Sequence, residues 1–402
     1  LLSELVALEQ VYLGDTRITA DGLAHLGKMT LMEVLNLEGL PVDADAINTH
    51  LKGRLDLSRV NLARTHIDDE GLGTLNWLSN LEALVVTPGI TDRGTPHLSA
   101  FTKLEVLFLD GNQITDEGLA PIGELRQLKR LSLKSTPVSV AGLCRLATSQ
   151  VLQQVSFRHG SYSNNELILY STSRDDDLTA VAQLNQLRAL KLNQTSIGDA
   201  GLAHLAEMQN LVTLVLPRTT TDRGLAHLAK LTGLKHLAVL GRGVTGKGLR
   251  AVRGMILLTE LSLDGTRVDD EGLAHIARLE RLERLSCRRT LITDSGLTHI
   301  SSLFQLRVLR LDYNDISDDG LAHLGQLEEL RRLSLLRTRV NGDQLEPLEK
   351  LKRLELIDFN GTRVSSTDVD RLKRALPDCE IRSTVDPLLA ALRSNGDKLL
   401  PA

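Results

Sequence analysis

Aromatic residues are scarce in this chain of 402 residues and make up only 2% of it. Any core must therefore be aliphatic, because hydrophobic residues still account for 42% of the sequence. No apolar run approaches the roughly 18 residues that a membrane-spanning helix requires, and the start of the chain lacks the pattern of a signal peptide. These absences predict a large core of Leu, Val, Ile and Ala and no membrane span.

Cysteine is also scarce, and basic residues do not outnumber acidic ones. Cys144, Cys287 and Cys379 are odd in number and far apart in sequence, which disfavours a disulfide framework or a CxxC metal site. The formal net charge of −4 lacks the basic excess of a general nucleic-acid binder. We therefore expect no cofactor, no metal and no nucleic-acid partner. The lack of cysteine-rich caps favours a cytoplasmic location.

What the sequence does contain is a repeat. Residues 104–128 read LEVLFLDGNQITDEGLAPIGELRQL, and this skeleton recurs every 23 to 25 residues with one longer gap of 35. About fifteen units can be counted, which indicates a stacked repeat architecture. The alternating leucines of L-x-L predict a short strand, and the leucines spaced by three in G-L-x-x-L predict a short helix or 3₁₀ turn.

One unit cannot bury its leucines alone, but stacked units can. Neighbouring strands lie about 4.8 Å apart, whereas packed helices need about 8–10 Å. The strand side must therefore lie on the inside of a curve. The sequence predicts an α/β solenoid, a curved arc with a concave parallel β-sheet and short convex helices. Thr or Asn follows the strand in most units, as at Thr266 and Asn314, and is expected to hydrogen-bond the turning backbone.

These residues resemble the leucine-rich repeat family over roughly residues 8–381. The ITDxGL core is similar to repeats of bacterial leucine-rich repeat proteins, of GALA-type effectors and of the cysteine-containing class found in F-box substrate receptors. This chain has Thr or Asn where the cysteine-containing class often has Cys. The resemblance implies a leucine-rich repeat solenoid and a role in protein recognition.

The repeat pattern predicts a single solenoid over residues 1–382 that starts in the middle of a unit. A tail over 383–402 is expected to follow, as a short helix or a partly disordered segment. The longer gap marks an insertion at about residues 158–176. One hypothesis is a rim loop whose Tyr162 and Tyr170 contact a partner, since aromatic loop residues are frequent anchors. The other is a tolerated insertion whose ELILY segment folds back onto the arc.

Histidine recurs with the repeat. Seven of the eleven histidines lie three residues after the repeated Gly position. They are His25, His97, His204, His227, His275, His299 and His323. A zinc site would need two or three imidazoles to converge, but helices of adjacent units hold them about 8–10 Å apart. We interpret these residues as packing at the convex seams between helices rather than as ligands.

The concave face is the expected binding surface, and its character changes along the chain. The first units present a mixed face that includes Tyr12 and Phe108. Later units present six arginines, one aspartate and one tyrosine on three adjacent strands, which suits an acidic protein surface. The alternative is a solvated face with local Arg–Asp pairs. The predicted contact residues are Arg284, Arg288, Arg289, Arg310, Asp312, Tyr313, Arg332 and Arg337.

No catalytic motif is present: the sequence has no GxSxG, no P-loop, no HExxH and no GxGxxG after a strand. We predict a non-enzymatic, monomeric scaffold that binds a partner protein. A second hypothesis is the substrate-recognition arm of a larger multidomain enzyme or ubiquitin-ligase-type adaptor, with the chemistry elsewhere. A third is a purely structural or cell-surface array.

Overall fold

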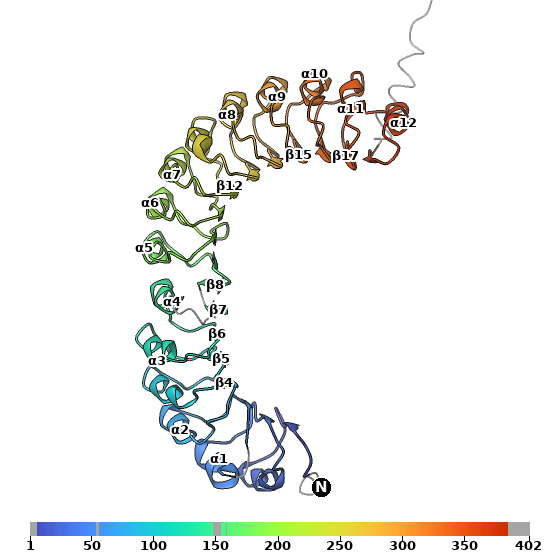
Figure 1. Cartoon of the computed structure of the whole chain (residues 1–402). Coiled ribbons are helices and arrows are strands. Elements are labelled where there is room, and N and C mark those ends of the chain that lie inside the picture. Colours follow the sequence, from blue (N-terminus) through green and yellow to red (C-terminus); the bar gives the residue numbers. More distant parts are fainter. Residues whose placement is uncertain (1–5, 54–55, 148–153, 158, 385–402) are drawn as a thin grey trace, which may run out of the picture. The chain divides into compact units, whose positions relative to one another are not determined.

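A computed structural model describes residues 6–53, 56–147, 154–157 and 159–384. The chain divides into two compact units, Leu1–Leu169 and Tyr170–Ala402. Within each unit the strands line one face and the short helices cover the other, and the strand face is the concave one (Figure 1). The predicted tail helix lies outside the described residues, and the single-solenoid organisation stays a prediction.

In the first unit, strands β1 to β7 pair in parallel, each with the next along the chain, and β7, β8 and β9 pair antiparallel. The strands are β1 (Gln10–Tyr12), β2 (Val34–Asn36), β3 (Arg59–Ala63), β4 (Ala83–Thr87), β5 (Val106–Phe108), β6 (Arg130–Leu133), β7 (Gln154–Phe157), β8 (Gly160–Ser163) and β9 (Glu166–Leu169). The helices are η2 (Ala20–Lys28), α1 (Ala44–Leu51), α2 (Asp69–Thr74), η3 (Thr95–Ala100), α3 (Leu119–Gly123) and α4 (Val140–Ala147).

In the second unit, strands β10 to β18 form an entirely parallel ladder. The strands are β10 (Ala189–Lys191), β11 (Thr213–Val215), β12 (His236–Ala238), β13 (Glu260–Ser262), β14 (Arg284–Ser286), β15 (Val308–Arg310), β16 (Arg332–Ser334), β17 (Leu356–Asp358) and β18 (Glu380–Arg382). The helices are α5 (Asp177–Val181), α6 (Asp199–Ala203), α7 (Asp222–His227), η4 (Gly248–Gly254), α8 (Asp270–Ala274), α9 (Asp294–Ile300), α10 (Asp318–Leu321), η5 (Ala322–Leu324), α11 (Glu346–Glu349) and α12 (Ser366–Ala375).

The core consists of equivalent leucines stacked from unit to unit, as the repeat predicts. Leu261, Leu285, Leu309 and Leu333 occupy successive positions of the ladder, and none is more than 1% exposed. Each such side chain contributes about 1.5–3 kcal/mol on burial, before ordering entropy is subtracted. The mixture of α and 3₁₀ turns on the opposite face also confirms the prediction from leucines spaced by three.

In many units the turn after the strand is held by a Thr or Asn side chain, as predicted. Thr266 Oγ1 donates to the Leu263 carbonyl at 2.7 Å, and the same bond recurs in other units, for example from Thr65 and Thr338. Asn314 forms two such hydrogen bonds, because its amide nitrogen donates to the carbonyls of both Cys287 and Leu311. The turning backbone is therefore satisfied by side chains inside the stack.

The repeated Asp and Gly of the ITDxGL core interact between neighbouring units. Asp294 accepts hydrogen bonds from Ser317 N at 2.8 Å and Ser317 Oγ at 2.6 Å, one unit further along. A Cβ on Gly320 of that next unit would lie 2.3 Å from Asp294 Oδ1. Asp92 with Thr115 and Asp270 with Thr293 repeat these bonds. Gly is therefore required because the carboxylate of the preceding unit fills the space of a side chain.

The insertion forms two antiparallel strands, β8 and β9, that extend the sheet of the first unit. Tyr162 is only 3% exposed, and its hydroxyl donates to Asn165 Oδ1 at 3.0 Å. The prediction that Tyr162 is an exposed anchor is wrong, because the alternation along β8 turns this ring into the core. For residues 166–169, the structure supports the hypothesis that the insertion folds back.

Candidate functional site

The candidate site lies on the concave face of the second unit, where β13 to β16 present side chains in rows. The strand register places Arg284 beside Glu260 and Val308, and Arg332 beyond Val308. In the neighbouring row, Arg310 is flanked by Ser286 and Ser334. Each Arg310 neighbour in this row is small, so the guanidinium stands in open space.

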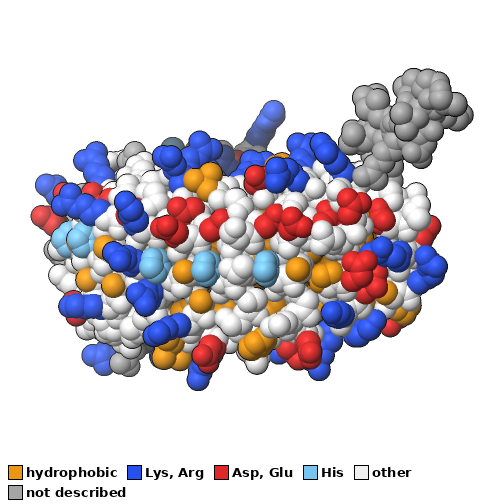
Figure 2. Space-filling model, turned by 90° about the horizontal axis from the view of Figure 1, so that it is seen from above, with side chains coloured by type: hydrophobic (Ala, Val, Ile, Leu, Met, Phe, Trp, Pro, Cys, Tyr) orange, Lys and Arg blue, Asp and Glu red, His pale blue; other side chains and the backbone are white. Residues whose placement is uncertain are grey.

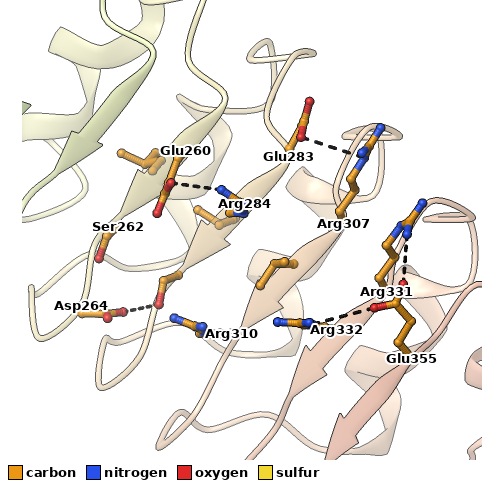
Figure 3. A pocket seen from close by; sticks show the side chains of 14 residues that line it. Glu260, Ser262, Asp264, Glu283, Arg284, Arg307, Arg310, Arg331, Arg332 and Glu355 are labelled. Carbon is orange, nitrogen blue, oxygen red and sulfur yellow. Dashed lines mark hydrogen bonds and ion pairs between the residues drawn. The ribbon is translucent and has the colours of Figure 1, made fainter. Parts of the chain in front are cut away.

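These rows form a groove of about 590 Å³ (Figure 3). Five arginines and four acidic residues line it, which leaves an excess of one positive charge. The arginines are Arg284, Arg307, Arg310, Arg331 and Arg332, and the acidic residues are Glu260, Asp264, Glu283 and Glu355. The groove is therefore strongly polar but nearly neutral.

Most of these charges are paired with one another. Arg284 lies 3.6 Å from Glu260, and Arg307 lies 3.9 Å from Glu283. Glu355 accepts from Arg331 at 3.0 Å and lies 4.0 Å from Arg332. All of these side chains are more than a third exposed. Such pairs contribute little to stability in water, so a partner could exchange them at small cost.

Arg310 differs from the other arginines of the groove. In the part of the chain that the structure describes, no carboxylate forms an ion pair with it. Figure 3 shows it with no dashed line to any neighbouring side chain. The two flanking serines are engaged elsewhere: Ser286 Oγ donates to Asp264 at 2.6 Å, and Ser334 Oγ donates to Asp312. Arg310 is therefore the arginine of the groove that has no ion pair with a carboxylate of the described residues.

A second feature lies where β14, β15 and β16 end. Arg289, Tyr313 and Arg337 have φ values of 54°, 60° and 54°, in the left-handed region. The equivalent turn position in other units is often glycine, as at Gly265 and Gly361, with φ of 71° and 70°. A left-handed residue that is not glycine costs on the order of 1–2 kcal/mol. Three consecutive units thus carry a strain that glycine would remove.

The side chains at these three strained positions stack on one another. The Arg289 guanidinium carbon lies 4.4 Å from the centroid of the Tyr313 ring, and that of Arg337 lies 5.6 Å from it. Both distances are within the range of cation–π attraction. Tyr313 remains 37% exposed. We name this set, Arg289, Tyr313 and Arg337, the rim cluster.

Two of the predicted contact residues are engaged by hydrogen bonds within the chain itself. Asp312 is only 6% exposed and accepts hydrogen bonds from Ser334 Oγ and from Leu336 N. Its prediction as an exposed contact is wrong, because the side chain is buried and bonded to residues of the next unit. Arg288 is held by Asp264 through Nε at 3.0 Å and Nη2 at 2.8 Å, which raises the pKa of Arg288. This pair fits the alternative of local Arg–Asp pairing.

The structure brings Arg284, Arg310 and Arg332 together in the groove and sets the rim cluster beside it. Tyr170 is 37% exposed but precedes α5, several strands away from β14. The concave-face pattern did not predict Arg307 and Arg331, each of which directly precedes a strand. It also did not predict the left-handed conformation of the rim cluster. An alignment of the units reveals this conformation, because glycine recurs at the equivalent turn position.

The repeated histidines lie on the helical side, as predicted, and Figure 2 shows histidine side chains there in a row. His204 is exposed and approaches Thr179 Oγ1 at 3.5 Å, whereas His299 and His323 are half-buried. Partial burial and the nearby charges of Arg253 and Arg250 lower the pKa of His275. Within the described ranges, no cluster of His, Cys, Asp or Glu is placed to hold a metal ion.

The cysteines are all buried. Burial and the Asp264 charge raise the pKa of Cys287 far above its ordinary value, and burial raises the pKa of Cys379 to about 11. Because only the thiolate reacts, we expect the folded chain to resist a disulfide reagent such as DTNB at pH 8. Reaction should rise steeply only as urea unfolds the protein. Rapid labelling of Cys287 in the absence of urea would contradict this prediction.

Comparisons with known proteins agree with this geometry. The Leucine Rich repeat model matches residues 102–123 and 304–325. An internalin from Listeria monocytogenes is 19% identical with a TM-score of 0.54, and the match covers 90% of this chain and 93% of that one. The fold is a leucine-rich repeat solenoid. A leucine-rich repeat protein of Leptospira interrogans is likewise 19% identical, with a TM-score of 0.55 over 94% of this chain and 91% of that one.

No curated protein sequence matches the chain significantly. Leucine-rich repeat proteins are commonly scaffolds for protein interaction, because stacked units build an extended preformed surface. Among the described residues, no helix has both the length and the apolar character needed to cross a membrane.

Proposed function

We propose that this leucine-rich repeat solenoid is a non-enzymatic scaffold that binds a partner protein on the concave face of its second unit. The observation that carries the proposal is Arg310, an exposed guanidinium that has no ion pair among the described residues and lies in a groove whose acidic residues are all engaged. An exposed arginine with free donors is suited to a carboxylate, which it binds through two parallel hydrogen bonds.

The shape of the site supports the same proposal. The groove lies on a parallel sheet whose strands are fixed by the buried leucines, so little order is lost on binding. The weak pairs of Arg284 with Glu260 and of Arg332 with Glu355 can be reorganised by a partner that presents acidic side chains. We infer that the partner surface is acidic and that the chain acts as a monomer.

The finer class of the repeat belongs to the same proposal. We infer that the units are of the bacterial ITDxGL type. The inter-unit bonds of Asp270 to Thr293 and of Asp294 to Ser317 support this, because they use the residues of that signature.

The test is capture from a native lysate by the full chain, with Arg310→Glu and a matched control, Arg250→Glu. Arg250 is an exposed arginine on η4, on the opposite face. We expect a partner held by the parent and by Arg250→Glu to bind Arg310→Glu at least tenfold more weakly, which corresponds to about 1.4 kcal/mol. Thermal melts would establish that all three proteins are folded.

Equal binding of the partner by both variants would contradict the proposal. The concave face of the first unit, where Tyr12 is 65% exposed and Phe108 is 37% exposed, would then be the better candidate surface.

A further inference from the structure

The rim cluster concentrates positive charge at one point without neutralising it. Arg289 and Arg337 reach the Tyr313 ring from the units on either side, at 4.4 and 5.6 Å. In the described part of the chain, neither guanidinium forms an ion pair with a carboxylate, and both side chains are exposed. Two guanidinium groups and a phenol hydroxyl are therefore available at the ends of β14, β15 and β16.

The first unit shows how the same turn position is neutralised. Arg64 is also left-handed, with φ of 56°, and it donates to Asp15 and to Glu38, each at 3.0 Å. Asp15 occupies the equivalent turn, with φ of 56°. Two carboxylates thus surround one guanidinium there, whereas two guanidiniums surround an uncharged ring in the rim cluster. Among the described residues, no carboxylate fills the corresponding place in the second arrangement, so the rim cluster can take an acidic group from a ligand.

The rim cluster is also held in place before any ligand arrives. The backbone N–H groups of Arg289, Tyr313 and Arg337 donate to the carbonyls of Asp312, Leu336 and Asn360, at 2.9, 2.9 and 2.8 Å. The next turn position is Gly361, where a Cβ would lie 2.7 Å from Arg337 Cγ. The glycine leaves space for the aliphatic part of Arg337. The backbone at these positions is therefore fixed before binding, and the two guanidinium groups rest on the Tyr313 ring, which limits the order lost on binding.

We propose that the rim cluster binds a dianionic oxyanion, the phosphate of a phosphorylated side chain on the partner protein. Two uncompensated guanidiniums match the charge of about −1.5 to −2 that a phosphorylated side chain carries at neutral pH. Their planar forks suit its oxygens, and Tyr313 Oη offers one further donor. The partner's identity as a protein rests on the proposed function, but phosphate binding itself does not.

The surroundings favour a single phosphate over a nucleic-acid backbone. The adjoining groove has an excess of only one positive charge, and the whole chain carries −4. A polyanion requires a continuous row of unpaired cations. In the adjoining groove, by contrast, the arginines are interspersed with glutamates. The free charge is local, at Arg310 and at the rim cluster.

The test is a titration of the full chain with phenyl phosphate, followed by calorimetry at low salt. We expect saturable binding of one phosphate that is at least tenfold weaker in Arg289→Gln/Arg337→Gln. A second exposed arginine pair, altered in Arg250→Gln/Arg253→Gln, serves as the matched control and should bind like the parent. Binding should weaken from pH 7.5 to pH 5, because the dianion of a phosphate monoester takes up a proton near pH 6 and becomes a monoanion.

Several results would overturn the proposal. They are the absence of saturable binding, an equal loss in both double variants, and tighter binding of a single-stranded RNA oligomer than of phenyl phosphate at these same arginines. Arg310→Glu separates this proposal from the proposed function. It should abolish capture of the partner yet leave phenyl phosphate binding within a few-fold of the parent, so that either proposal can fail alone.

Discussion

Gly320→Ala should destabilise the protein by about 2–3 kcal/mol, a large effect for one added methyl group. The new Cβ would lie 2.3 Å from Asp294 Oδ1 and 3.0 Å from Leu297 Cδ1. The carboxylate cannot withdraw freely, because it accepts hydrogen bonds from both Ser317 N and Ser317 Oγ. Urea unfolding measures the change. Gly254→Ala is the matched control, because its nearest neighbour would be Thr232 Cγ2 at 3.8 Å.

A double-mutant cycle tests the cause. Asp294→Ala alone should cost about 2 kcal/mol, since the hydrogen bonds to Ser317 involve a charged acceptor. In that background Gly320→Ala should cost less than about 1 kcal/mol, because the obstructing oxygen is gone and Leu297 can rotate. If the two costs add instead, the glycine is required for a reason other than the carboxylate of the preceding unit.

Asn314→Ala should be similarly damaging, at about 3 kcal/mol. Asn314 Oδ1 accepts from Thr290 N and from Thr290 Oγ1, each at 2.9 Å, while its amide nitrogen donates to two carbonyls. The side chain is only 6% exposed, so its removal leaves buried backbone groups unsatisfied. Chemical denaturation at neutral pH is the measurement.

Two comparison variants sharpen this expectation. Asn314→Thr should cost only about 1–2 kcal/mol, because a threonine here can still donate to the Leu311 carbonyl, as Thr266 does to Leu263. Thr266→Ala removes one hydrogen bond and should cost about 1 kcal/mol. An Asn314→Ala variant no less stable than Thr266→Ala would show that the inter-unit bonds of Asn314 contribute little.

The environment of a residue could be predicted from the sequence where the repeat is regular, but not where it is interrupted. The helical-side placement of His299 and His323 follows from their position in a regular repeat, where every unit repeats the same environment. Tyr162 lies in the one segment that breaks the repeat, so no neighbouring unit predicted its environment. Its burial was decided by β8 pairing antiparallel with β7 and β9.

The repeat in the sequence by itself determined the solenoid, the parallel strand ladder, the stacked leucine core and the Thr or Asn turns. Each of these depends on spacing within a unit and on the need of every unit to bury the same face. Tertiary structure alone decided which charges are free. Arg284 has Glu260 opposite it on β13, and Arg332 lies near Glu355, the residue just before β17, whereas Arg310 has serines on both sides. Ion pairing therefore depends on which residue of the next unit the stacking brings alongside.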